Sequence, residues 1–176
     1  MTTRAPRSRQ AHGQGTGSDL LAIYLNDHLL GATVGVERAH YLAEQCTDPE
    51  VTKSLGPIAK EIAEDRRSLV DIMRRLDIPI RRYKVYAGRL AERVGRLKSN
   101  GSLVRRSPLT TMVELEFLRL GVEGKAACWQ TLRELTDTEE RLDAQHLDVL
   151  ADRAVRQLSN LEELRRRQAR KVFADT

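Results

Sequence analysis

Residues 21–46, LAIYLNDHLLGATVGVERAHYLAEQC, and residues 51–76, VTKSLGPIAKEIAEDRRSLVDIMRRL, decide the fold of this chain. Each stretch keeps a four-three spacing over four heptads, which places the spaced side chains on one face of an α-helix. One titratable residue interrupts each stripe of small or apolar residues, His28 in the first and Asp65 in the second. The other stripe positions are Leu21, Leu25, Ala32, Gly35, Ala39, Leu42, Cys46 and then Val51, Leu55, Ile58, Ile62, Leu69, Ile72, Leu76.

The two interruptions fall at matching heights. His28 lies 18 residues before residue 46, and Asp65 lies 16 residues after residue 49, so in an antiparallel pair both stand about 25 Å from the joint. The spacing therefore predicts a hydrogen bond between His28 and Asp65. An unpaired charge inside a bundle costs several kcal/mol, so such a pair serves as a buried tie that sets the register of the two helices.

Composition predicts an all-α chain with one domain. The 176 residues include only 4% aromatic residues and five prolines, a profile typical of long helices. Cys46 and Cys128 stand in apolar helical contexts, where a thiol is an inert small hydrophobe. No apolar run resembles a signal peptide or a membrane span, and we expect a cytoplasmic protein. Phosphate-binding glycine loops, Cys-x-x-Cys pairs and nucleophile elbows are absent from the sequence.

Helix-capping residues and prolines divide the chain into a basic arm and four long helices. Residues 1–17 lack periodicity and predict a disordered arm. Ser18 or Asp19 caps the first helix, and the Thr47-Asp48-Pro49-Glu50 run predicts a new helix with Thr47 as its N-cap. Pro57 is expected to kink that helix or to delay its start. The four helices are predicted at about 18–46, 49–76, 108–135 and 136–171.

The connection from 77 to 107 is too long for a tight turn between antiparallel helices. It contains an amphipathic stretch at about 82–98, with Tyr86, Leu90, Val94 and Leu97 on its inward face. That stretch spans about 25 Å as a helix, most of the length of a bundle. Short joints at either end and one long crossover in the middle define the ferritin-like arrangement of a four-helix bundle, here over residues 18–172.

Charge is unevenly distributed. The net charge is +5, yet a basic strip in the crossover carries nine cations against only Glu92. Such a strip is either a solvated face or an attractant for nucleic acid, anionic lipid or an acidic partner. The strip consists of Arg81, Arg82, Lys84, Arg89, Arg93, Arg96, Lys98, Arg105 and Arg106.

Polar residues also interrupt the other two helices. In the last helix the stripe is Asp143, Leu147, Leu150, Ala154, Gln157, Leu161, Leu164, Gln168, with His146 at its edge. In the third helix, Glu114 lies between two apolar arcs, and we expect it to be partly buried with Lys125 as a cationic partner. Glu116, Arg119 and Glu123 are spaced as an exposed ladder of ion pairs.

Several motifs resemble ferritin-like bundles, and more closely a group of uncharacterised actinobacterial helical-bundle proteins. The resemblance covers about residues 20–170 and implies the same bundle fold, with no activity attached to it. It is carried by Tyr24-Leu25-Asn26-Asp27-His28, Gly31-Ala32, Gly35-Val36-Glu37, Gly95-Arg96-Leu97-Lys98-Ser99-Asn100-Gly101, Arg106-Ser107-Pro108-Leu109, Glu114-Leu115-Glu116 and Gly121-Val122-Glu123-Gly124-Lys125.

The resemblance also suggests the hypothesis of a carboxylate-bridged metal site. Di-iron members supply a Glu from each of two helices and Glu-x-x-His from each of the other two. This chain has Glu37-x-x-His40 and the variant Asp143-x-x-His146, so the signature is incomplete and falls on the wrong pair of helices. The candidate ligands for iron or manganese are His28, Glu37, His40, Glu61, Asp65, Glu114, Asp143 and His146.

Three hypotheses about function follow. The leading one is a bundle without catalytic chemistry, with no bound cofactor, that acts as an interaction or assembly module and pairs with a second copy or a helical protein. The first alternative is an iron or manganese protein with oxidase or iron-handling activity. The second alternative is a protein associated with nucleic acid through its basic arm and the basic strip.

Overall fold

The computed structural model describes residues 16–46, 48–81 and 108–174, and every regular element among them is a helix. The helices are α1 (Gly17–Gln45), α2 (Pro49–Arg75), α4 (Pro108–Glu134) and α5 (Ala144–Phe173). The prediction of an all-α bundle of four long helices is thus confirmed. The predicted basic arm, apart from residues 16 and 17, and the predicted helix at 82–98 lie outside the described residues.

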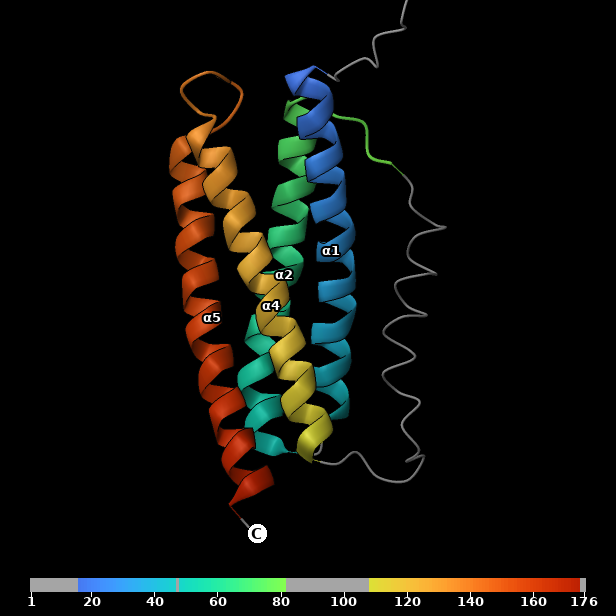
Figure 1. The fold of residues 1–176 in the computed structure, drawn as a ribbon, viewed down its shortest axis with the longest axis vertical. Coiled ribbons are helices and arrows are strands. Elements are labelled where there is room, and N and C mark those ends of the chain that lie inside the picture. Colours follow the sequence, from blue (N-terminus) through green and yellow to red (C-terminus); the bar gives the residue numbers. More distant parts are fainter. Residues whose placement is uncertain (1–15, 47, 82–107, 175–176) are drawn as a thin grey trace, which may run out of the picture.

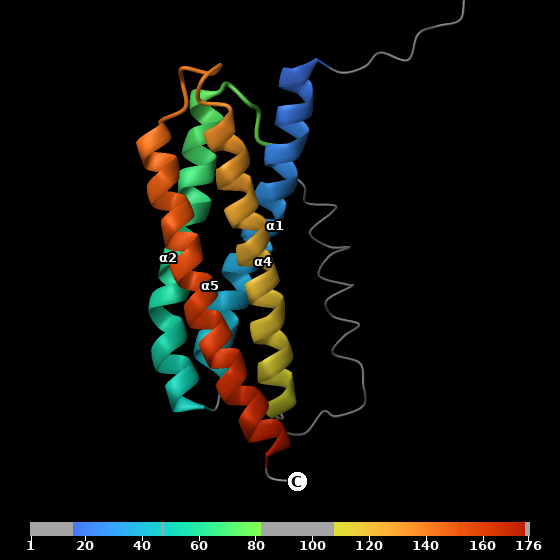
Figure 2. The same cartoon turned by 60° about the vertical axis from the view of Figure 1, so that its left-hand side comes forward.

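The helices form two antiparallel hairpins packed side by side. In Figure 1, α1 runs down and α2 runs up, while α4 runs up and α5 runs down. The closest packing is within the hairpins, α1 against α2 and α4 against α5, and α1 also packs against α4. Figure 2 shows α1 and α4 on one side of the bundle and α2 and α5 on the other. Because α2 and α4 run the same way, the end of α2 and the start of α4 lie at opposite ends of the bundle.

Capping residues set the starts of α1 and α2, one to three positions from the predicted ones. Thr16 precedes α1, and its backbone N–H donates to the Asp19 carboxylate at 3.1 Å. Asp48, and not Thr47, is the N-cap of α2, and its Oδ1 accepts from the Glu50 N–H at 3.1 Å. The α2 helix continues without interruption through Pro57.

The start of α5 was predicted too early. The helix begins at Ala144 and not at residue 136, because side chains in the joint bond to nearby backbone in place of the helical ladder. The Thr136 hydroxyl donates to the Arg133 carbonyl, and the Thr138 hydroxyl donates to the Leu135 carbonyl. Asp143 is therefore the N-cap of α5, accepting from the His146 N–H at 3.0 Å, and is not a member of an inward stripe.

The core follows the predicted stripes closely in α2 and α5 and less closely in α1. Every member of the α2 stripe is buried, including Asp65, as is every member of the α5 stripe from Leu147 to Gln168. In α1, Asn26 and Leu29 are buried while His28 is only half-buried. Because α1 packs against both α2 and α4, its buried surface also includes Asn26 and Leu29, which lie beside the stripe.

Candidate functional site

A cluster of polar side chains occupies the middle of the bundle. Asp65 of α2 is fully buried, and its Oδ2 accepts hydrogen bonds from the Lys125 ammonium of α4 and from Gln157 Nε2 of α5 at 3.2 Å. Arg153 Nε, also on α5, lies 3.0 Å from Asp65 Oδ1. Three helices therefore converge on one carboxylate, which we call the Asp65 cluster.

Gln157 links the Asp65 cluster to its surroundings. Its Oε1 accepts from Lys125 Nζ at 2.5 Å, and its Nε2 also donates to Glu61 Oε2 at 2.9 Å. Arg153 extends the network outward through Glu64, with 2.9 Å between Arg153 Nη1 and Glu64 Oε2. The Gln157 side-chain amide thus uses both its oxygen and its nitrogen in hydrogen bonds, as a buried amide must to avoid a desolvation penalty.

The heptad positions explain how these groups reach the core. Asp65 and Gln157 replace apolar residues in the stripes of α2 and α5, so their side chains point directly inward. Lys125 enters from the edge of α4, with its side chain only 13% exposed. The sequence indicated Asp65 and Gln157 as interruptions, but it wrongly paired Asp65 with His28 and Lys125 with Glu114. Glu114, partly buried as expected, pairs with Arg38 of α1.

Electrostatics favour a charged, mutually compensated cluster. Burial lowers the pKa of the Lys125 ammonium, and the adjacent Asp65 carboxylate opposes that shift. Two cations, Lys125 and Arg153, face the Asp65 carboxylate, while Glu61 and Glu64 lie one contact further out. A carboxylate taken out of water is tolerated only when it is paired in this way. Removal of Asp65 leaves the Lys125 ammonium, whose side chain is only 13% exposed, without its paired carboxylate.

The eight predicted metal ligands do not converge. Only Glu61 and Asp65 are neighbours within the cluster, and both contact Gln157. His28 packs its ring against Tyr24, with 4.4 Å between the ring centroids, and Glu37 and His40 are exposed on α1. Among the residues that the structure describes, no group of three or more His, Cys, Asp or Glu side chains is placed to hold a metal ion. Glu114, Asp143 and His146 complete the predicted set and lie in the contacts given above.

The Cys128 thiol is unsuited to nucleophilic chemistry. Cys46 and Cys128 are both free, and Cys128 is buried in the core. Burial raises the pKa of the Cys128 thiol to about 12, and a hydrogen bond with Tyr24 opposes part of that rise. A thiol with such a pKa is almost wholly protonated near neutral pH, so it is a poor nucleophile.

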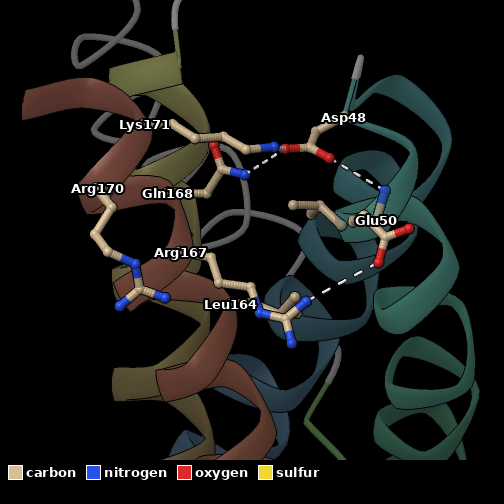
Figure 3. Close-up of a pocket in the computed structure, with 8 residues that line it drawn as sticks. Asp48, Glu50, Leu164, Arg167, Gln168, Arg170 and Lys171 are labelled. Carbon is tan, nitrogen blue, oxygen red and sulfur yellow. Dashed lines mark hydrogen bonds and ion pairs between the residues drawn. The ribbon is translucent and has the colours of Figure 1, made fainter. Parts of the chain in front are cut away.

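A second polar site closes the end of the bundle where α2 begins and α5 ends. Figure 3 shows Gln168 and Lys171 of α5 both pointing at Asp48, the N-cap of α2. Gln168 Nε2 lies 2.7 Å from Asp48 Oδ2, and Arg167 lies 3.9 Å from Glu50. The cavity they line measures about 270 Å³ and also includes Val51, Leu164 and Arg170. Its acids and most of its cations are already paired with one another.

Ion pairs on α4 run between helices and not along one helix. Arg119 lies 3.5 Å from Glu162 of α5, and Arg165 of α5 lies 3.8 Å from Glu116. Ion pairs between α4 and α5 therefore replace the predicted ladder of Glu116, Arg119 and Glu123. A hydrogen bond from Arg165 lowers the pKa of Glu162 to about 2.

Of the basic strip, only Arg81 falls among the described residues, where it is exposed. The other eight cations of the strip lie outside them, so the nucleic-acid hypothesis stays a prediction.

None of the helices within the described ranges is long and apolar enough to cross a membrane. No protein-family model matches the chain, and comparisons with curated proteins and with solved structures found no match.

Proposed function

We propose that this chain is a ferritin-like four-helix bundle that acts as an interaction or assembly module and has no catalytic centre. The observation that carries the proposal is the Asp65 cluster. At the level where a bundle of this type has room for a cofactor between its hairpins, the chain places a lysine ammonium and an arginine guanidinium around one carboxylate. A cation at that position competes with a metal ion for the same carboxylate oxygens.

The direction of the helices supports the ferritin-like part of the proposal. Because α2 and α4 run in parallel, the connection between them is long, whereas the α1–α2 and α4–α5 joints are short. The partner is a second copy of the chain or another helical protein. A bundle that holds the Asp65 cluster in its interior makes such contacts through its outer helical faces.

The proposal is tested by measuring metal uptake and self-association on one pair of proteins. The first is the full chain, and the second carries Asp65→Leu, Lys125→Met, Arg153→Met and Gln157→Leu together. Replacing a buried ionic cluster by apolar residues of similar volume is often neutral or stabilising. We therefore expect the variant to fold and to self-associate like the parent in sedimentation equilibrium.

After incubation with ferrous iron or manganese, followed by desalting, we expect both proteins to carry far less than one metal ion per chain. Stoichiometric metal in the parent that disappears in the variant would contradict the proposal and favour the metal-protein alternative. A parent that remains monomeric at all concentrations would exclude self-assembly and leave only the heterologous partner.

A further inference from the structure

An apolar ridge runs along the outside of α4. Its members follow a four-four-three-four-three spacing, so they share one face of the helix, and none is charged. Phe117 is 52% exposed and Leu120 is 62% exposed, values far above those of core residues. The ridge consists of Leu109, Val113, Phe117, Leu120, Gly124 and Ala127.

The ridge is distinct from scattered surface hydrophobics. On α5 the three large exposed apolar residues are Val149, Val155 and Phe173, which are too far apart along the helix to form a continuous face. On α2, no large apolar residue is exposed to a comparable extent. A contiguous apolar face on a described helix marks a surface that something covers.

The end of the preceding chain segment is fixed close to this side of the bundle. Asn26 of α1 is 1% exposed; its Nδ2 donates to the Pro79 carbonyl at 3.1 Å and its Oδ1 accepts from the Arg81 N–H at 2.8 Å. The chain therefore leaves the top of α2, crosses to α1 and is held there, as Figure 2 shows for the segment that ends near residue 81. It re-enters the described structure at Pro108, at the opposite end of α4.

The length of the intervening segment fits a path along α1 and α4. From the level of Asn26 to the end of α1 is about 29 Å at 1.5 Å per residue. The sequence predicts a helix at 82–98 that spans about 25 Å, and residues 99–107 add up to about 30 Å when extended. No detour around α2 or α5 is needed to join Arg81 to Pro108.

Charge also distinguishes the two sides of the bundle. The α1 helix carries four acids and one arginine, and α4 carries four acids and three bases, whereas α5 carries seven bases and four acids. Residues 82–107 carry eight bases and one acid. A strongly basic segment is attracted to the acidic α1–α4 side and repelled from the basic α2–α5 side.

We propose that residues 82–107 of the same chain cover the α4 ridge. The four apolar residues spaced along the predicted helix, Tyr86, Leu90, Val94 and Leu97, then pack on the ridge, and the arginines and lysines between them face the acids of α1 and solvent. A second copy of the chain is a poorer occupant, because it would bring one acidic α1–α4 side against another. This inference is independent of the proposed function.

Cross-linking within one chain tests the proposal directly. In a Cys46→Ser background, Val94→Cys is combined either with Leu120→Cys on the ridge, where Leu120 is 62% exposed, or with Val149→Cys on α5, where Val149 is 53% exposed. Dilute full-length protein is treated with a short bismaleimide and analysed by gel mobility and peptide mass. Residues held together in one chain have effective concentrations in the millimolar range, about a thousandfold above micromolar protein. We expect a cross-linked monomer with the ridge pair and little with the α5 pair.

Two results would overturn the proposal. A cross-linked dimer as the main product of the ridge pair would assign the ridge to a second copy. Equal yields of cross-linked monomer from both pairs would show that residue 94 has no preferred position.

Trypsin gives a second measurement that needs no added cysteine, since the segment is rich in lysine and arginine. Phe117→Asp with Leu120→Asp removes the apolar contact, and we expect cleavage within 82–106 to accelerate about tenfold or more. The matched control is Val149→Asp with Val155→Asp on α5, which we expect to leave the rate unchanged. Acceleration of the same size in both variants, or in neither, would contradict the proposal.

Discussion

The two sides of the bundle are built differently. Between α2 and α5, charged and amide side chains bridge the helices from Asp48–Gln168 at one end to Glu64–Arg153 near the middle. Between α1 and α4 the bridges are fewer; they include a Tyr24–Thr131 hydrogen bond of 3.2 Å and the Arg38–Glu114 ion pair, and an apolar ridge is exposed beside them. The α2–α5 side is bridged by these polar contacts, whereas the α1–α4 side has an apolar face that no described residue covers.

This difference shows where polar residues stabilise the fold and where they only keep it soluble. Within the Asp65 cluster of the α2–α5 side, Asp65 and Gln157 are fully buried and paired, so losing the Asp65 carboxylate removes a shared partner of Lys125, Arg153 and Gln157. Among the described residues of α1 and α4 no charged side chain is fully buried, and partly exposed ion pairs such as Arg38–Glu114 contribute less. Substitutions on the first side should therefore cost more than comparable substitutions on the second.

The largest effect is expected at Asp65. Asp65→Ala leaves Lys125 and Arg153 without their shared carboxylate, and breaking a buried pair typically costs about 3–5 kcal/mol. The free energy of unfolding from urea titration followed by circular dichroism measures the loss. Asp71→Ala is the matched control on α2, because Asp71 is 54% exposed and pairs with the neighbouring Arg74, and it should stay within about 0.5 kcal/mol of the parent. Equal losses in the two variants would contradict a stabilising role for the cluster.

A smaller loss is expected at Asn26, the buried amide of the α1 side. Asn26→Ala removes the acceptor for the Arg81 N–H and the donor to the Pro79 carbonyl, which should cost about 1–3 kcal/mol in the same urea titration. The exposed Asn160 of α5 supplies the control variant Asn160→Ala. If Asn26→Ala costs as much as Asp65→Ala, the contrast between the two sides is wrong.

Acid should destabilise the end of the bundle where α2 begins and α5 ends. The hydrogen bond from Lys171 holds the pKa of Asp48 below its ordinary value of 3.8, so its stabilising contribution is present above that value and is lost as pH falls through the lowered pKa. Asp48→Asn keeps a good N-cap but removes the titration, so the acid loss of stability should be shallower than in the parent. Thermal unfolding across a series of acidic buffers measures this, with the exposed Asp152→Asn as the control. If stability falls with pH as steeply in Asp48→Asn as in the parent, titration of Asp48 does not contribute to the acid loss of stability.

The smallest effect is expected at His28, on the α1 side. Burial lowers its pKa below the ordinary value of 6.5, with opposition from Asp27, so the unfolded chain takes up this proton before the folded one does. Stability should therefore fall as pH drops from 6.5 through the lowered pKa, and His28→Gln should remove that part of the dependence. Thermal unfolding over this window compares His28→Gln with His40→Gln, a change at an exposed position. A larger effect in His40→Gln would contradict the assignment to His28.

The sequence was most informative where a helix is buried along a single stripe. The α2 stripe from Val51 to Leu76 was predicted in full, because apolar residues at four-three spacing have no other way to leave water. The α5 stripe was predicted equally well from Leu147 onward. For α1 the same reasoning misplaced His28, because that helix packs against both α2 and α4 and its buried line includes Asn26 and Leu29.

Candidate site residues were predictable as positions but not as partners. The interruption at Asp65 and that at Gln157 were visible in their stripes, and the partial burial of Glu114 was also expected. Their contacts were not predictable, because each partner comes from another helix. Lys125 of α4 reaches Asp65 of α2, and Arg38 of α1 reaches Glu114 of α4. Long flexible cations select among several acids at similar distances, and helix spacing alone does not rank those choices.

By itself, the sequence determined the four helices, the hairpin pairing implied by short joints, and a buried carboxylate halfway along α2. These follow from local periodicity and capping, which act within one helix or between neighbours in the chain. Only the tertiary structure decided that Asp65 meets Lys125, Arg153 and Gln157, and that Phe117 and Leu120 face outward. Both outcomes depend on how the two hairpins rotate against each other, and that rotation is set by packing between residues far apart in the chain.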